Sequence, residues 1–271
     1  MKIRSFWGMI TASVIAVVVI GGCRSEFEKV RLSNDPERIL AEASKYYEEA
    51  EYLRAQTLYD IILSQYRGRP ESEQIFFRYA YTYYYLRQYT LAAHYFNNFS
   101  NTFAYSEFRE EADYMSAYAN FQLSPSFRLE QSQTSQAIQG FQDFVNRYPN
   151  SPRVAECNRL IDEMRAKLEQ KAYANAELYF EIGEYEGAIQ SFENMLTDFP
   201  DTERVEFVRY QILRAAYLFA EKSIYEKRKE RYELAIEKYM DFTRKFPNSN
   251  YKAEAETIYQ DSQEQIKILN Q

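Results

Sequence analysis

Five segments of the chain repeat one helical pattern. In each, a small residue is followed four positions later by an aromatic residue and seven positions after that by a second aromatic residue. The small residues are Ala55, Ala92, Ala137, Ala188 and Ala235, the first aromatics Tyr59, Phe96, Phe141, Phe192 and Tyr239, and the second Tyr66, Phe103, Tyr148, Phe199 and Phe246. These spacings keep the three side chains on one helical face. The chain is therefore expected to form several similar amphipathic helices that pack closely at the alanines.

Each of these segments follows another amphipathic segment, and the pair has the pattern of a tetratricopeptide repeat. The unequal intervals between the alanines break the sustained heptads that a coiled coil needs. Three helices end at related sequences that contain proline, YPNSP, FPDTE and FPNSN, where the helix cannot continue. We predict an all-α solenoid of five irregular helix pairs plus a C-terminal cap helix, with the first helix of each pair lining a concave surface.

The predicted organisation has three parts. A signal peptide covers residues 1–22, a lipid-anchored polar tether residues 23–35, and the tetratricopeptide-repeat domain residues 36–271. The repeats are expected at about 36–68, 73–104, 107–149, 152–200 and 202–247, with the cap helix at 250–269. The third repeat contains a long loop, and the first helix of the fourth repeat runs uninterrupted through 153–184.

The N-terminus has the features of an exported lipoprotein. Lys2 and Arg4 precede an apolar run at 6–20 that is shorter than the roughly 20 residues needed to span a bilayer. The run ends in IGGC, which resembles a bacterial lipobox, so Cys23 is expected to carry a diacylglycerol and an N-acyl lipid as its membrane anchor. The alternative is an ordinary secretory signal peptide in which this cysteine has no special role.

Composition argues against catalysis and against nucleic-acid binding. The chain has a net charge of −7, and removal of Lys2 and Arg4 with the signal peptide makes the mature part more acidic. His94 is the only histidine, and lipidation of Cys23 leaves Cys157 without a partner for a disulfide. We expect no metal site, no catalytic residues and no cofactor besides the covalent lipid, and we expect Cys157 to be buried.

Tyrosine is unusually abundant, with 26 residues. In the second repeat, Phe76, Tyr79, Ala80 and Tyr83 are expected to face the partner helix, whereas Phe77, Tyr81, Tyr84 and Tyr85 occupy the other face, and Tyr47 continues that face in the first repeat. Tyrosine combines a large rigid ring with a hydroxyl, which suits capture of an extended apolar or aromatic peptide. The alternative, that these rings only pack against neighbouring segments, stays open.

Three stretches, together with the lipobox, carry a family resemblance. They are YAYTYYYLRQYTLAAHYFNNF at 79–99, AIQGFQDFVNRYPNS at 137–151 and KAYANAELYFEIGEYEGAIQSFENMLTDFPDT at 171–202. With these features the chain resembles, over essentially its whole length, the BamD family of lipoproteins in the machinery that assembles outer-membrane β-barrel proteins. The resemblance implies a non-enzymatic scaffold that is lipid-anchored in the outer membrane and faces the periplasm.

The resemblance also implies partners and sites. The partners are a BamA-like barrel protein with POTRA domains, other subunits of the assembly machine, and unfolded outer-membrane proteins. The N-terminal repeats would receive the aromatic-ended targeting signal of the substrate, with Tyr47, Phe77, Tyr81, Tyr84 and Tyr85 as groove candidates. The C-terminal repeats would contact the barrel subunit, with candidates Glu181, Glu184, Arg214, Lys222 and Arg228 chosen by location. A different tetratricopeptide lipoprotein, serving as a secretin pilotin or a cell-wall enzyme scaffold, remains the alternative.

Overall fold

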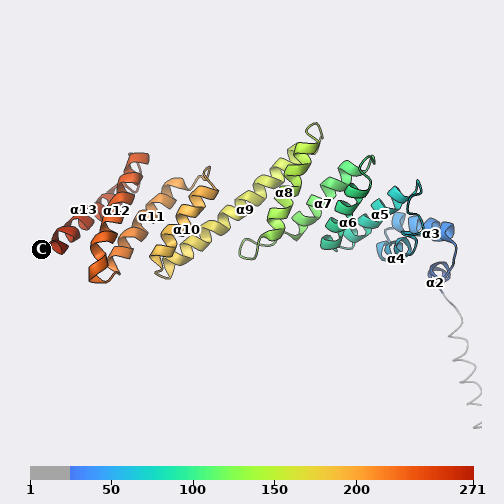
Figure 1. Cartoon of the computed structure of the whole chain (residues 1–271), viewed down its shortest axis with the longest axis horizontal. Helices are drawn as coiled ribbons and strands as arrows, with labels where there is room; N and C mark the ends of the chain where they lie inside the picture. The colour runs from blue at the N-terminus through green and yellow to red at the C-terminus, as the bar shows by residue number, and fades with distance from the viewer. Residues whose placement is uncertain (1–24) are drawn as a thin grey trace, which may run out of the picture. The chain divides into compact units, whose positions relative to one another are not determined.

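The computed structural model describes residues 25–271, so the predicted signal peptide and Cys23 lie outside the described residues. Over this range the chain consists of α-helices joined by turns and loops, without strands, which confirms the all-α prediction (Figure 1). The helices are α2 Glu26–Arg31, α3 Pro36–Glu48, α4 Tyr52–Ile62, α5 Ser72–Tyr85, α6 Tyr89–Thr102, α7 Arg109–Leu123, α8 Ser132–Arg147, α9 Val154–Glu181, α10 Tyr185–Asp198, α11 Val205–Glu221, α12 Tyr225–Lys245 and α13 Lys252–Leu269. Within residues 25–271, no helix combines the length and apolar character needed to cross a bilayer.

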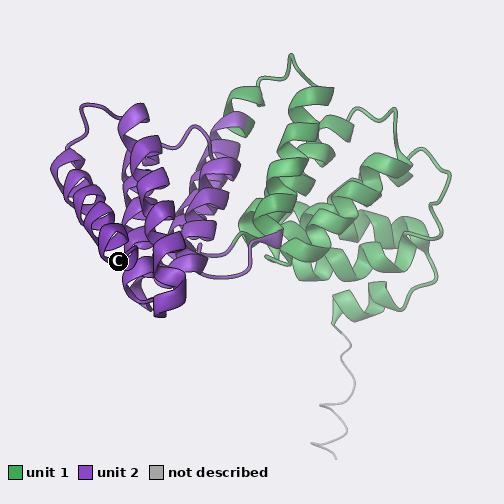
Figure 2. Cartoon of the chain, turned by 60° about the vertical axis from the view of Figure 1, so that its left-hand side comes forward, with its two compact units in different colours: residues 1–124, 133–157 green, residues 125–132, 158–271 purple. Residues whose placement is uncertain are grey.

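The chain divides into two compact units. Among the described residues, unit 1 contains 25–124 together with 133–157, and unit 2 contains 125–132 together with 158–271 (Figure 2). Unit 1 therefore includes α2 to α7 and all of α8 except its first residue, and unit 2 includes α10 to α13.

The repeated small and aromatic residues occupy the faces on which the helices pair. All five alanines of the pattern are buried, and so are the aromatics four positions later in the first four segments, namely Tyr59, Phe96, Phe141 and Phe192. Tyr239, the fifth, is half-buried. Alanine on one helix lets the next helix approach, and the aromatic side chain fills the space beside it. The periodic face of the sequence is thus the packing face of the fold.

Three of the turns between paired helices share one backbone conformation. Ala50, Arg87 and Gly183 have positive φ angles of 59°, 58° and 84°. In each turn the following amide donates back to a carbonyl five residues earlier, at 2.8 Å from Glu51 to Tyr46 and at 2.9 Å from Gln88 to Tyr83. This left-handed residue ends the first helix and directs the chain into the second. Glycine adopts the conformation freely, whereas alanine and arginine adopt it at a cost.

The segment predicted as a polar tether is partly helical. Helix α2 covers 26–31, and the Ser25 side chain accepts a hydrogen bond from the amide of Glu28 at its start. Val30 is buried, and the ring of Phe27 lies 5.9 Å from that of Tyr46 on α3. The structure therefore adds a short helix within the predicted tether, because two apolar side chains three positions apart form a face that packs on the first repeat.

Candidate functional site

The five predicted groove residues lie together in unit 1. With Tyr52 they form what we call the aromatic cluster: Tyr47 on α3, Tyr52 on α4, and Phe77, Tyr81, Tyr84 and Tyr85 on α5. Ring centroids are 5.1 Å apart between Phe77 and Tyr81, 5.6 Å between Tyr81 and Tyr85, and 6.3 Å between Tyr85 and Tyr47. The spacing along α5 places its four rings on adjoining positions of one helical surface.

Phe77 and Tyr81 differ from the sequence prediction in the face that they occupy. They were expected to point away from α6, but Phe77 lies 5.4 Å from Phe99 and Tyr81 lies 4.9 Å from Phe96, both on α6. Phe77 also stacks on Phe108 at 4.8 Å. The stripe of α5 that contacts α6 is therefore wider than predicted. These two rings form the floor of the cluster by packing, and both are half-buried.

Tyr85 is the exposed ring of the cluster. Its side chain retains 43% of its accessible surface although it stacks on Tyr52 at 4.3 Å. Tyr47 lies beside both rings, 5.8 Å from Tyr52, and is half-buried. Stacked rings with one face open to solvent offer rigid apolar contact area at little cost in side-chain entropy. The surface at Tyr85 can accept an aromatic or apolar side chain.

Hydrogen bonds fix the orientation of the floor. The Tyr81 hydroxyl donates to Glu111 on α7, whose other carboxylate oxygen pairs with Arg153. Burial, followed by the hydrogen bond to Glu111, raises the pKa of Tyr81, and burial likewise raises the pKa of Tyr47. Both hydroxyls are therefore protonated at neutral pH and act as hydrogen-bond donors.

Sequence reasoning missed two members of this surface. Tyr52 joins the cluster from the second helix of the first repeat, and the guanidinium of Arg78 lies 5.2 Å from the centre of the Tyr47 ring. Arg78 also pairs with Glu48 at 3.5 Å. Arg78 lies seven residues before Tyr85, so both side chains are on one side of α5. This spacing is the sequence signal that could have identified Arg78 as part of the surface.

The two residues that the sequence singled out for possible chemistry are placed as ordinary structural residues. His94 is exposed on α6 beside Tyr95. Cys157 is fully buried, as predicted, and burial raises the pKa of its thiol to about 11. Among residues 25–271 no group of three or more histidine, cysteine, aspartate or glutamate side chains is placed to hold a metal ion.

The candidates for the barrel-subunit contact lie in unit 2. Glu181, Glu184 and Lys222 are exposed. Arg214 is half-buried, and its guanidinium lies 5.1 Å from the centre of the Phe180 ring. Arg228 donates to the backbone oxygens of Ser223 and Glu221, so it satisfies carbonyl groups at the end of α11. Three of the five are therefore open to a partner, and two make contacts within the chain.

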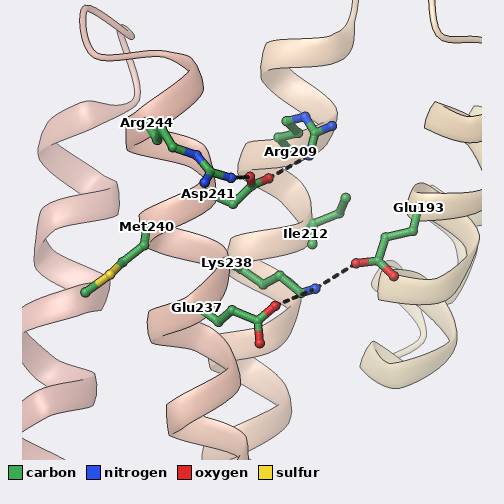
Figure 3. A pocket seen from close by; sticks show the side chains of 8 residues that line it. All are labelled: Glu193, Arg209, Ile212, Glu237, Lys238, Met240, Asp241 and Arg244. Carbon is green, nitrogen blue, oxygen red and sulfur yellow. Dashed lines mark hydrogen bonds and ion pairs between the residues drawn. The ribbon is translucent and has the colours of Figure 1, made fainter.

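Unit 2 also contains a polar cavity of about 560 Å³, which we call the charged groove (Figure 3). Ile212 on α11 forms part of its floor. Lys238 on α12 pairs with Glu193 on α10 at 2.8 Å, and Asp241 pairs with Arg209 at 2.8 Å and with Arg244 at 2.6 Å. Partial burial opposes ionisation of Asp241, but hydrogen bonds from Lys245 and Arg244 outweigh it and lower its pKa.

Unit 1 contains a groove of the same construction between α6, α7 and α8, with a volume of about 290 Å³, which we call the amide groove. Its lining includes Asn97, Asn120, Gln136 and Gln139. Asp113 on α7 accepts from Arg147 on α8 at 2.6 Å and from the Tyr148 hydroxyl at 2.8 Å. Both grooves thus hold an ion pair between a first helix and the helix that follows it.

Comparison with known proteins supplies a family and a curated relative. The family described as YfiO, outer membrane lipoprotein, matches residues 33–231, which is more than half of the chain. Outer membrane protein assembly factor BamD of Rickettsia prowazekii (strain Madrid E) is 24% identical over 214 residues, which cover 76% of this chain and 82% of that protein.

Two solved structures of repeat proteins are also similar. The TPR domain of P58(IPK) has a TM-score of 0.41 and 14% identity, over 86% of this chain and 66% of that one. A TPR repeats protein of Bacteroides fragilis NCTC 9343 has a TM-score of 0.37 and 13% identity, over 86% of this chain and all of that one.

Proposed function

The chain belongs to the YfiO family of outer membrane lipoproteins, and from this membership we propose that it is a non-enzymatic scaffold of the machinery that assembles β-barrel proteins in the outer membrane. In this proposal Cys23 carries the lipid anchor and the two units face the periplasm. The similarity to a curated assembly factor over 82% of that protein's length supports the assignment.

The aromatic cluster receives the targeting peptide of an unfolded outer-membrane protein in this proposal. The observation that carries it is the exposed Tyr85 ring, which is stacked on Tyr52 and flanked by Tyr47 over a floor of packed rings. An extended peptide with alternating apolar side chains can place one of them on this surface while tyrosine hydroxyls bind its backbone.

The C-terminal repeats contact the barrel subunit. The support for this part is the exposure of Glu181, Glu184 and Lys222 in unit 2. Exposed charges at the rim of an interface mainly affect the rate of association and partner choice. We therefore expect charge reversal at these three positions to weaken binding of a POTRA-containing partner more strongly at low salt than at high salt.

Site-specific photo-crosslinking in cells tests both contacts. A crosslinking amino acid at position 85 should capture unfolded outer-membrane proteins, and one at position 184 should capture the POTRA-containing barrel subunit. Tyr105 is a matched control, because it is a fully exposed tyrosine of the same unit outside the cluster. Equal capture of substrates from positions 85 and 105 would contradict the peptide-binding role.

Purification of the lipidated protein in mild detergent tests the complex itself. Recovery of a POTRA-containing barrel protein in stoichiometric amount is the expected result. Recovery of a secretin or a cell-wall synthase in its place would transfer the function to the alternative class of tetratricopeptide lipoproteins.

A further inference from the structure

A further cavity of unit 2 lies between α11 and α13 and has a volume of about 320 Å³. We call it the arginine pocket; it is lined by Tyr210, Arg214, Tyr217 and Leu218 on α11 and by Thr257 and Ile258 on α13. Tyr210 also stacks on Tyr251, the residue before α13, with ring centres 4.4 Å apart. Leu218 and Ile258 are half-buried, so both keep apolar surface open to the pocket. Two helices thus wall the pocket with aromatic and aliphatic side chains.

Both tyrosine hydroxyls of the pocket already have acceptors on α13. Tyr210 donates to Glu254, which also lines the pocket, and Tyr217 donates to Asp261 at 2.7 Å. Burial, followed by the hydrogen bond to Glu254, raises the pKa of Tyr210 to about 12, so this hydroxyl is a donor at neutral pH. The two carboxylates are therefore engaged by tyrosines, and the two rings are held in place as walls of the pocket.

Arg214 is the cation of the pocket, and its partners within the chain are neutral. Its guanidinium donates to the side-chain oxygen of Gln211, a buried residue, at 2.8 Å. The ring centres of Phe180 and Tyr210 lie 5.1 and 5.8 Å from it. Within residues 25–271 Arg214 forms no ion pair. Because a guanidinium has five N–H donors, most of its hydrogen-bonding capacity is left for an anion that enters the pocket.

The same place in unit 1 is filled by a tyrosine that has its own acceptor. In both units an aromatic residue of a first helix stacks on the aromatic residue that precedes the helix after the pair, and these stacks align the two units. In unit 1 the aligned glutamate accepts from the Tyr81 hydroxyl, whereas in unit 2 it accepts from Tyr210. Arg214 therefore stands where a self-satisfied tyrosine stands in unit 1, and its nearest equivalent acid is engaged elsewhere. The aligned pairs are Phe77 with Tyr210, Phe108 with Tyr251, Tyr81 with Arg214 and Glu111 with Glu254.

The spacing of the pocket side chains matches an extended peptide. Arg214 and Leu218 are four positions apart on α11, which is about 6 Å along the helix axis. Side chains two positions apart in an extended chain point to the same side and are separated by about 7 Å. Among anions of a peptide, a carboxylate suits arginine best, because the two groups form a pair of parallel hydrogen bonds.

We infer that the arginine pocket binds an extended segment of a protein partner that carries an acidic residue and a large apolar residue two positions apart, with Arg214 on the carboxylate and Leu218 and Ile258 on the apolar side chain. Charge complementarity selects this occupant, because the pocket offers a cation without an ion pair beside apolar walls, and a small carboxylate alone would leave those walls exposed. The inference goes beyond the proposed function. It requires neither the targeting-peptide role of the aromatic cluster nor the contact with the barrel subunit, so its failure would leave both standing.

The first test compares three peptides with blocked ends. A fluorescent peptide carries glutamate and leucine two positions apart in a background of serine and glycine, and matched peptides replace the glutamate by glutamine or the leucine by serine. Each is titrated with the full-length protein in mild detergent. The glutamate–leucine peptide should bind roughly ten-fold tighter than the glutamine peptide, because the latter lacks a charge-assisted hydrogen bond. The serine peptide should also bind more weakly, since it leaves the apolar walls uncovered.

The net charge of the chain sharpens this comparison. At −7 the protein as a whole repels an acidic peptide, so a preference for glutamate over glutamine must come from a local cation. Equal affinities of the glutamate and glutamine peptides, or absence of binding, would overturn the inference. Equal affinities of the leucine and serine peptides would also overturn it, because the carboxylate alone would then suffice.

Matched arginine variants locate the site. Arg214→Gln should abolish the preference for the glutamate peptide, while Arg214→Lys should keep part of it. Arg204→Gln is the control, because Arg204 directly precedes α11 and also lies over a ring, 4.8 Å from the centre of Tyr173, but does not line the arginine pocket. A preference that survives Arg214→Gln, or that Arg204→Gln reduces equally, would place the peptide on another surface and overturn the assignment.

A variant at an exposed position tests the pocket without disturbing the packing around Arg214. Thr257 is exposed, and its hydroxyl bonds to the carbonyl of Ala253 within α13. Thr257→Glu should therefore leave the unfolding midpoint unchanged while it brings a competing carboxylate to the pocket. Binding of the glutamate peptide should weaken several-fold, and Thr257→Gln, the size-matched control, should have a smaller effect. Equal binding by the two Thr257 variants would overturn the inference.

Sedimentation velocity distinguishes a partner protein from a second copy of this chain. The unaltered protein and Arg214→Gln are compared at the same concentrations in the same detergent. Equal sedimentation coefficients are expected, because the occupant is a segment of another protein. If the unaltered protein self-associates and Arg214→Gln does not, the occupant is a second copy, and the assignment to a partner protein is overturned.

Discussion

The two grooves occupy equivalent places in their units and differ in chemistry. Aligning Ala92 with Ala188 matches Asn97 with Glu193, and aligning Ala137 with Ala235 matches Asp143 with Asp241. In unit 1 the acid of the interhelical pair is on α7 and the arginine on α8, whereas in unit 2 the arginine is on α11 and the acid on α12. The repeat thus preserves a packing register and an ion pair, but not which helix carries which charge.

Helix spacing and surface chemistry are therefore specified by different residues of the repeat. The alanines that set helix spacing are buried in both units, and so are the aromatics four positions later in the first four segments. The residues around them are free to change, because exposed positions contribute little to the free energy of folding. Amide side chains line one groove and charged side chains the other, so a partner that binds one groove is not expected to bind the other.

Truncating the equivalent buried rings is expected to have the largest effect. Phe96 and Phe192 are both fully buried, and replacement of either by alanine should lower the free energy of unfolding by about 3–5 kcal/mol. Urea unfolding followed by circular dichroism measures the loss. Similar losses at the two positions are expected from the common register. A loss below 1 kcal/mol at either position would contradict the common packing register of the two segments.

Gly140 tests how closely α7 and α8 approach in unit 1. A Cβ atom at this position would lie 2.9 Å from the Cβ of Ala117, so Gly140→Ala should destabilise the protein by about 1–2 kcal/mol although alanine favours helix formation. The equivalent residue of unit 2 is Lys238, where an alanine fits without a clash and removes an ion pair with Glu193. Greater stability of Gly140→Ala in thermal unfolding would contradict the close approach.

Substitutions at the left-handed turns are expected to change the free energy of unfolding in opposite directions in the two units. Gly183→Ala in unit 2 should destabilise by about 1–2 kcal/mol, because no neighbouring atom compensates for a strained backbone. Ala50→Gly in unit 1 should stabilise by about 0.5–1 kcal/mol, since relief of the strain exceeds the added entropy of the unfolded chain. Chemical denaturation of both variants checks the signs, and a stabilised Gly183→Ala variant would refute the argument.

Acid should affect the charged groove through Asp241. Its pKa is lowered in the folded state from an ordinary value of 3.8, so its stabilising contribution is present above that value and is lost as the pH falls through the lower folded pKa. Because the side chain is 28% exposed, we expect Asp241→Asn to cost only about 1 kcal/mol at neutral pH. The difference from the unaltered protein should shrink on acidification below the ordinary pKa; a constant difference would exclude the ion pair as its cause.

Helix pairing was predictable from the sequence because it depends on a period. In each of the five segments the alanine and the following aromatic residue are four positions apart, and the 28-residue α9 was visible as an unbroken amphipathic stretch. The short α2 was missed, since two apolar residues such as Phe27 and Val30 give too little pattern to separate a helix from a tether.

The aromatic cluster was predictable only in part. Spacing on α5 identified Tyr84 and Tyr85, but it could not give the width of the stripe that contacts α6, so Phe77 and Tyr81 were placed on the wrong face. Tyr52 and Arg78 were missed because their membership depends on the angle at which α3, α4 and α5 meet. No local pattern in a single sequence determines the angle at which these helices pack.

The stacked tyrosines also give the protein an optical signal of its own. Trp7 is the only tryptophan and precedes the predicted cleavage site, so ultraviolet emission from the mature chain would come from tyrosine. Rings as close as Tyr52 and Tyr85, at 4.3 Å, exchange excitation and couple their transitions, which gives near-ultraviolet circular dichroism that depends on the stacking geometry. A ligand whose ring displaces Tyr85 from Tyr52 would therefore change the spectrum of the unlabelled protein.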